Sequence, residues 1–85
     1  MFTVYVLHSE KTGRRYVGSS NDLLARFEQH NRGQVCATKG GRPWEIVHTE
    51  TYPTGGEARR RELSLKTGQG RAELDRILGT VGSAP

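Results

Sequence analysis

The spacing of apolar side chains along the chain predicts three strands. In residues 2–8, apolar and aromatic side chains fill both sets of alternating positions, which is typical of a strand with two apolar faces. Polar residues at 9–13 separate it from a second short strand at 14–19, and a connection of about five residues predicts an antiparallel hairpin. Residues 44–52 are rich in aromatic and β-branched side chains and form the third predicted strand.

Capping residues define the ends of three predicted helices. Residues 21–32 begin with good N-cap side chains and end before Gly33, a favourable residue after a helix C-terminus. Residues 54–66 open with the Thr-x-x-Glu spacing of a capping box. Residues 71–78 place three apolar side chains at helical spacing, and Gly79 is expected to end this last helix.

The element order defines the fold class. Residues 34–43 contain two glycines and a proline among basic side chains and predict a basic loop. Residues 80–85 are mostly small and are expected to form a disordered tail after a single domain over residues 1–79. The order β-β-α-β-α-α predicts an α/β domain with a small three-stranded, largely antiparallel sheet flanked by helices.

Composition excludes several classes of protein. The 85 residues contain no apolar window of about 18 residues, which excludes a transmembrane span. The apolar start is too short for a signal peptide and lacks a basic region before it, so we expect a cytoplasmic location. A single cysteine, Cys36, allows neither an internal disulfide framework nor a Cys-rich zinc site.

The charge balance favours an anionic partner. Thirteen Lys and Arg residues against nine Asp and Glu give a net charge of +4, as in many nucleic-acid-binding domains. A genome rich in arginine codons would produce the same excess. The placement of the charges therefore has to decide between the two explanations.

Five polar side chains on four predicted elements are candidates for chemistry. They are Tyr5, Tyr16, Arg26, His30 and Glu62. Each also has an ordinary structural explanation. Strand tyrosines pack their rings into a core, an arginine on a helix is commonly solvated, and a histidine near a helix C-terminus complements the helix dipole. Glu62 has the spacing to pair with Arg59 or Lys66. Taken singly, none of them indicates a function.

In combination, these residues resemble the catalytic domain of the GIY-YIG endonucleases. The sequence TVY at residues 3–5 is followed by YVG at 16–18, then by RFEQHN at 26–31 and ELSLK at 62–66. The resemblance extends from residue 3 to about residue 78, and the family's element order agrees with the predicted one. A threonine replaces the first glycine of the family's name, and valines replace both isoleucines.

The resemblance implies a role for each candidate. Glu62 would bind one divalent cation, Mg²⁺ or Mn²⁺, which accept oxygen ligands. Tyr5 would be the general base for the attacking water, and Tyr16 would orient the water or the scissile phosphate. Arg26 would hold the phosphate and, like the metal, would lower the pKa of the tyrosine, because a phenol is otherwise a poor base at neutral pH. His30 would assist proton transfer, and the choice of base between Tyr5 and His30 stays open.

Further residues are expected to contact phosphate groups of DNA. These are Gly18, Ser19, Ser20, Asn21, Lys39, Arg42, Arg59 and Lys66. Gly18 is expected to let the strand end turn into the phosphate-facing segment 19–21. Four more arginines, at positions 14, 15, 60 and 61, complete a possible phosphate-tracking surface, with scattered solvated charges as the alternative.

The expected function is that of a metal-dependent endonuclease. It would hydrolyse phosphodiester bonds of DNA with low sequence specificity, because the chain has no room for a separate specificity domain. Single-stranded, structured and duplex DNA all remain candidate substrates, and neither a membrane nor an obligate protein partner is expected. The alternative is a non-catalytic nucleic-acid-binding module with the same fold. A basic scaffold for a protein partner would explain neither the paired tyrosines nor the helix that carries Arg26 and His30.

Overall fold

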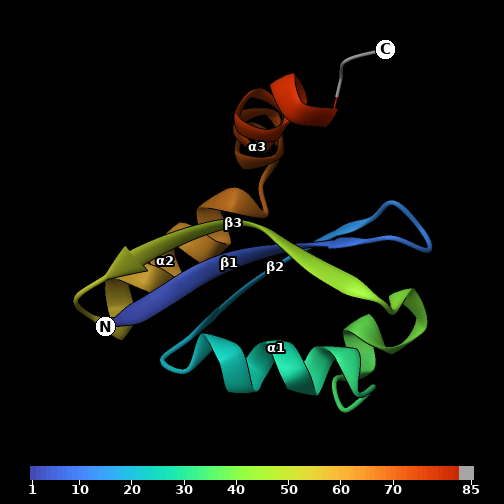
Figure 1. Ribbon diagram of the computed structural model, residues 1–85. Coiled ribbons are helices and arrows are strands. Elements are labelled where there is room, and N and C mark those ends of the chain that lie inside the picture. Colours follow the sequence, from blue (N-terminus) through green and yellow to red (C-terminus); the bar gives the residue numbers. More distant parts are fainter. Residues whose placement is uncertain (83–85) are drawn as a thin grey trace.

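The computed structural model describes residues 1–82 and contains three strands and four helices. The strands are β1 (Phe2–Ser9), β2 (Arg15–Ser20) and β3 (Trp44–Tyr52), and the helices are α1 (Leu23–Asn31), the 3₁₀ helix η1 (Cys36–Gly41), α2 (Gly55–Leu65) and α3 (Gly68–Gly82) (Figure 1). The predicted α/β class and the order β-β-α-β-α-α are confirmed. The structure contains one element that was not predicted, the 3₁₀ helix η1, which lies within the segment predicted to be a loop.

The three strands form one antiparallel sheet in the order β2-β1-β3. Strand β1 is central because both of its faces are apolar, and residues 4–7 are almost completely buried. Ser9 and Gly13 shape the turn of the hairpin: the Ser9 hydroxyl accepts hydrogen bonds from the backbone amides of Lys11 and Thr12, and Gly13 has a φ of 75°. The predicted hairpin and its two-faced strand are therefore confirmed.

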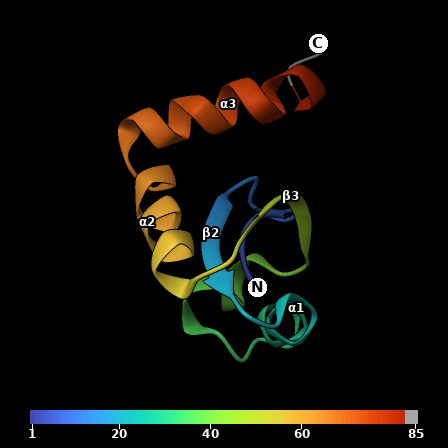
Figure 2. The ribbon, with the colours of Figure 1, turned by 90° about the vertical axis from the view of Figure 1, so that its left-hand side faces the viewer.

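Each face of β1 belongs to a separate hydrophobic core. On one face, Val4 and Val6 pack with Val17, Leu65 and Leu74, which joins the sheet to α2 and α3. The other face carries a second core, formed by Tyr5, Leu7 and Trp44 with partly buried side chains of α1. Helices α2 and α1 accordingly lie on opposite sides of the sheet (Figure 2).

Helix α2 starts at its predicted capping box, whereas α3 exceeds both of its predicted ends. The Thr54 hydroxyl accepts a hydrogen bond from the Glu57 amide at 3.2 Å. Helix α3 begins at Gly68 rather than at residue 71 and passes the expected stop at Gly79. A Cβ on Gly70 would collide with the backbone of α2, so this glycine permits the close contact between the two helices. Of the predicted tail, residues 80–82 are helical, and residues 83–85 lie outside the described residues.

No helix within residues 1–82 has both the length and the hydrophobicity needed to cross a membrane.

Candidate active site

Three rings meet on the α1 side of the sheet. The ring centroids of Tyr5 and Tyr16 are 6.5 Å apart, and that of His30 lies 5.7 Å from Tyr5 and 5.0 Å from Tyr16. The strand register explains why the two tyrosines share a face: Tyr5 is paired with Gly18, and Tyr16 lies two residues from Gly18 on β2. The hairpin thus brings together two tyrosines separated by ten residues in the sequence.

Gly18 provides the space for the Tyr5 phenol. A Cβ at this position would lie 2.5 Å from the Tyr5 hydroxyl oxygen and 2.7 Å from its Cζ, which is closer than real Cβ atoms approach. Gly18 lies inside β2, not at a strand end, and its backbone is extended. The expectation that Gly18 lets the chain turn is therefore wrong, because its function in the fold is to leave the surface of β2 open opposite Tyr5.

His30 is completely buried between β1 and η1. Its Nε2 lies 2.9 Å from the Tyr5 hydroxyl, and its Nδ1 lies 2.7 Å from the Thr38 hydroxyl. Its expected structural role was to complement the dipole at the C-terminus of its helix, whereas contacts from η1 leave it fully buried. Thr38 was missed by the sequence analysis, since it lies in a segment with the composition of a loop and no local pattern distinguishes it.

The imidazole of His30 and the phenol of Tyr5 both favour their neutral forms. Burial, together with the charge of Arg26, lowers the pKa of His30 to about 4. Burial also raises the pKa of the Tyr5 phenol, and the Arg26 guanidinium, which lowers it, offsets only part of that effect. Arg26 therefore lowers the pKa of Tyr5 as expected, but without a metal ion its effect is smaller than that of burial. At neutral pH, a neutral imidazole faces a protonated phenol.

Arg26 lies one helical turn before His30 on α1. Its guanidinium is partly buried and donates a hydrogen bond to the Gln29 side chain at 2.9 Å. The positive charge of Arg26 lowers the pKa of both Tyr5 and His30. Asp22 fixes the start of α1 by accepting a hydrogen bond from the Ala25 amide at 3.2 Å.

Glu62 is the one acidic member of the candidate set, and only 4% of its surface is exposed. The Ser19 hydroxyl donates a hydrogen bond to Oε1 at 2.7 Å, Lys66 Nζ lies 2.7 Å from Oε2, and Arg59 lies at 3.4 Å. Burial raises the pKa of the Glu62 carboxyl, but the hydrogen bonds from Lys66 and Ser19 and the nearby charges outweigh it, so the pKa lies below its ordinary value.

Lys66 links this carboxylate to the rings, because its Nζ lies 6.0 Å from the centroid of Tyr16. Tyr5, Tyr16 and His30 lie on the α1 face of the sheet, whereas Ser19 is paired with Val4 and holds Glu62 on the α2 face. Lys66 contacts both Glu62 and Tyr16 beside the edge strand β2. The pairing of Glu62 with Arg59 and Lys66, given above as its structural explanation, is also present.

Comparison with known proteins agrees with this geometry. Residues 1–74 match the family model of the GIY-YIG catalytic domain. The chain belongs to the GIY-YIG family. This is a nuclease-type family, and membership implies a nucleic-acid substrate.

Relatives of the GIY-YIG chain include UPF0213 proteins from two bacteria. One from Staphylococcus aureus strain Mu3 is 46% identical over 56 residues, which are 65% of this chain and 68% of the relative, and one from strain Mu50 gives the same values. The solution NMR structure of a UPF0213 protein from Bacillus halodurans has a TM-score of 0.56 and 28% identity, and the match covers 91% of this chain and 85% of that chain.

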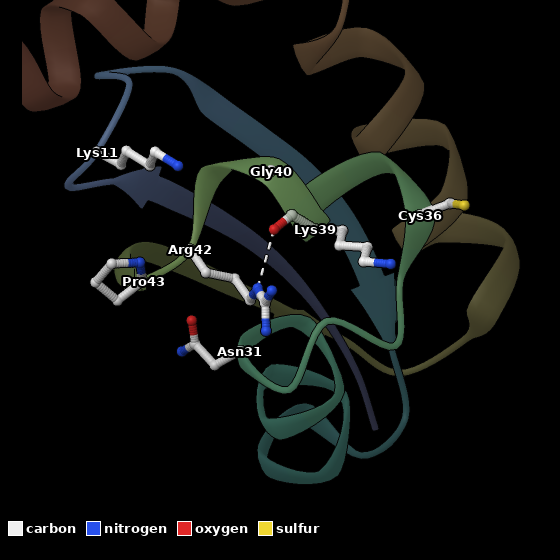
Figure 3. A pocket seen from close by; sticks show the side chains of 7 residues that line it. All are labelled: Lys11, Asn31, Cys36, Lys39, Gly40, Arg42 and Pro43. Carbon is white, nitrogen blue, oxygen red and sulfur yellow. Dashed lines mark hydrogen bonds between the residues drawn. The ribbon is translucent and has the colours of Figure 1, made fainter.

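The residues expected to bind phosphate around the GIY-YIG site fall into three groups. Ser19, Arg59 and Lys66 contact Glu62, as described above. Ser20 is used within the chain, since its hydroxyl donates to the Asp22 carbonyl at 3.1 Å, and Asn21 is exposed beside it before α1. Lys39 and Arg42 lie at η1 and belong to a shallow groove that is also lined by Lys11, Asn31, Cys36, Gly40 and Pro43 (Figure 3).

The wider basic surface is not continuous. Arg61 donates hydrogen bonds to Glu50 and Glu73 at 2.7 and 2.8 Å, and Arg15 pairs with Asp75 at 2.7 Å. These two arginines connect α3 to the rest of the fold, so their expected place in a phosphate-tracking surface is wrong for this structure. Trp44 is buried in the core beside Tyr5 and Leu7 and is not part of this surface.

Proposed function

We propose that this GIY-YIG domain is an endonuclease that hydrolyses phosphodiester bonds of DNA with one divalent metal ion and low sequence specificity. The observation that carries the proposal is the hydrogen bond between Tyr5 and neutral His30, with the Arg26 charge beside it. Hydrolysis requires a group that takes a proton from water and a positive charge for the phosphate. This arrangement supplies both.

The proton would move along the Tyr5–His30 pair. The attacking water forms the new P–O bond while its proton passes to the Tyr5 oxygen, and the phenolic proton passes to His30 Nε2. This relay needs no free phenolate, which the raised pKa of Tyr5 makes costly. Although the His30 pKa of about 4 makes the imidazole a weak base, the negative charge of an approaching phosphodiester raises its basicity. The leaving oxygen takes its proton from solvent as the P–O bond breaks.

Tyr16 and Arg26 would hold the reacting phosphate. Arg26 provides planar, permanently charged donors that suit phosphate oxygens. The Tyr16 ring lies close to both His30 and Lys66, where its hydroxyl would orient the phosphate or the water.

The surroundings of Glu62 fit a divalent cation. The carboxylate is held ionised, Ser19 adds a second hard oxygen, and Lys66 and Arg59 show that this position favours positive charge. Arg59 makes the longest of these contacts and is mostly exposed, so it can give way. Within residues 1–82 no group of three or more His, Cys, Asp or Glu residues could enclose a metal. Mg²⁺ or Mn²⁺ would therefore keep water and phosphate oxygens as its other ligands and neutralise charge on the phosphate.

The DNA backbone would continue from the site across η1. This helix presents Thr38 inward to His30 and exposes the neighbouring Lys39, and the groove beyond it is lined by Lys11, Lys39 and Arg42 (Figure 3). Three cations along one groove suit contacts to phosphate groups without reading of the sequence. We place the protein in the cytoplasm, because the exposed thiol of Cys36 suits a reducing compartment. We propose no obligate protein partner.

One observation favours the alternative, a nucleic-acid-binding module without catalysis. Both carboxylate oxygens of Glu62 already accept hydrogen bonds from Ser19, Lys66 and Arg59. In such a module these hydrogen bonds would persist and no metal ion would replace them. Glu62 would then serve to hold α2 against β2.

Cleavage assays with a matched control separate the two functions. Labelled single-stranded, duplex and branched DNA is incubated with Mg²⁺, Mn²⁺ or EDTA and with the wild type, Glu62→Gln, Arg26→Ala or the exposed-surface control Glu28→Gln. We expect metal-dependent cutting by the wild type and Glu28→Gln, and its loss in the other two variants while DNA binding persists. Cutting that is indifferent to EDTA, or retained in Glu62→Gln, refutes the metal assignment. Binding without cutting by the wild type establishes the alternative.

A further inference from the structure

Thr38 is a buried hydroxyl residue that contacts the candidate active site from η1. It is fully buried, and its Oγ1 lies 2.7 Å from His30 Nδ1 and 3.3 Å from the carbonyl oxygen of Val35. A threonine hydroxyl has one proton to donate and can accept in return. The two neighbours of Thr38 therefore restrict where the proton of the imidazole lies.

One arrangement of protons satisfies all the groups in this chain of hydrogen bonds. In this arrangement the Thr38 hydroxyl donates to the Val35 carbonyl, which also accepts from the Thr38 amide at 3.1 Å, and the hydroxyl accepts from Nδ1–H of His30. Nε2 of His30 then carries the lone pair, and Tyr5 donates its proton there. In the opposite arrangement Tyr5 would accept from Nε2–H, and its own buried proton would lose its only bonded acceptor in the described part of the chain.

The position of Thr38 is fixed by contacts on both sides of η1. The Trp44 indole donates to the Thr38 carbonyl at 2.7 Å. Trp44 is itself held by Asn31 of α1, which accepts from its amide at 2.7 Å and donates to its carbonyl at 3.0 Å. Gly41 packs against the Trp44 ring and accepts a hydrogen bond from Ser9 through its carbonyl. Because α1 and β3 both anchor η1, Thr38 and His30 keep a constant relative position.

We infer that Thr38 is a positioning residue, which holds His30 as the Nδ1–H tautomer so that Nε2 is free to receive the Tyr5 proton. The inference rests on the proposed function for its purpose, since a relay through Nε2 has a use only in proton transfer. An orienting partner on the second ring nitrogen is a general way to fix which nitrogen of a histidine is active. Thr38 acts on the reaction through His30 and touches no reacting atom itself.

The tautomer can be measured directly and without any assay of activity. Nitrogen-15 NMR of the imidazole of His30 distinguishes the two neutral tautomers at pH 7. We expect Nδ1–H in the wild type and in Thr38→Ser, which keeps the hydroxyl. In Thr38→Val, which keeps the side-chain size, we expect a shift toward Nε2–H. An Nε2–H tautomer in the wild type, or an unchanged Nδ1–H tautomer in folded Thr38→Val, overturns the inference. If Thr38→Val does not fold, the wild-type tautomer still decides.

Kinetics then connect the tautomer to the reaction. In a DNA cleavage assay, Thr38→Val is expected to lower kcat roughly 10- to 100-fold, in the range seen for orienting partners, with little change in KM. Thr38→Ser and the exposed control Thr51→Val should remain near wild type. A kcat for Thr38→Val equal to that of the wild type refutes the positioning role. If the wild type cuts no DNA, the proposed function fails, and the NMR result still stands as the test of the Thr38–His30 contact.

Discussion

The hydroxyl of Tyr5 lies 2.9 Å from Nε2 of His30, directly opposite a glycine on the neighbouring strand. The two residues come from β1 and α1, and a side chain on Gly18 would occupy the space of the Tyr5 phenol. The hydrogen bond between Tyr5 and His30 therefore depends on the lack of a Cβ at Gly18 of β2.

Gly18→Ala should displace Tyr5 from His30. The new Cβ would lie 2.5 Å from the phenolic oxygen, and overpacking of this kind costs about 1–3 kcal/mol of stability. We expect the free energy of unfolding in urea to fall by about that amount and DNA cleavage to fall with it. The control is Gly56→Ala, since a Cβ there meets no atom of the described structure within 4 Å. A Gly18→Ala variant as stable and active as Gly56→Ala would contradict the close approach.

Tyr5→Phe should separate catalysis from stability. The ring that packs between β1 and α1 is kept, and only the hydroxyl is lost. The free energy of unfolding should therefore change by only about 1 kcal/mol. The rate of DNA cleavage should fall about 10²- to 10⁴-fold, the usual contribution of a positioned proton-transfer group. Tyr52→Phe is the matched control, because it removes a hydroxyl bonded to Glu50 on the opposite face of the sheet. Equal cleavage rates for the two variants would exclude a role for the Tyr5 hydroxyl.

The buried His30 should make the fold less stable in mild acid. The titratable or charged groups that face it are Tyr5 from β1, Tyr16 from β2 and Arg26 from α1. Its pKa is lowered from 6.5 to about 4 in the folded state, so between these values the unfolded chain binds more protons. Stability is therefore lost as the pH falls from about 6.5 toward 4, by on the order of 2–3 kcal/mol.

The measurement is the free energy of unfolding at several pH values between 4 and 7 for the wild type and His30→Gln. The part of the pH dependence of the unfolding free energy that is due to His30 should be absent in His30→Gln. Glu50 acts in a lower range: Arg61 and His48 hydrogen bonds hold its pKa at about 2, so its contribution is lost only below its ordinary value of 4.5. Identical slopes for the two proteins would show that His30 is accessible to protons in the folded state.

Arg61, which forms ion pairs within the fold, and Arg42, which lines the groove beside η1, should respond differently to substitution. Arg61 bridges Glu50 of β3 and Glu73 of α3, so Arg61→Gln should destabilise the fold by about 1–3 kcal/mol and leave the salt dependence of DNA binding unchanged. Arg42→Gln should leave stability nearly unchanged and reduce the slope of log K against log salt by about 1. Fluorescence anisotropy at several salt concentrations measures the slope. A reduced slope in Arg61→Gln and none in Arg42→Gln would reverse the assignment of these two side chains.

Local patterns were sufficient to predict the framework of the site. Strand alternation predicted that Tyr5 and Tyr16 lie on adjacent strands, and the capping residues placed Arg26 and His30 together on one helix. Glu62 could be placed on α2 from the capping box at its start.

The parts that escaped prediction depend on contacts between distant residues. The segment 34–43 has the composition of a loop, and η1 is held there by Trp44 and Asn31 rather than by its own propensity. The burial of His30 and its bond to Thr38 follow from η1, so neither could be derived before the fold was known. The early start of α3 depends in the same way on Gly70 and its contact with α2.

Strand β1 contributes alternate residues to two separate cores, and this has a consequence for folding. If β1 paired with its neighbours one residue out of register, Tyr5 would turn toward α2 and α3, and a valine would face His30. Such a chain would lose both cores and the proton relay together. Because the same pairing error disrupts packing and chemistry at once, a misregistered molecule would be selected against through its instability before its inactivity mattered.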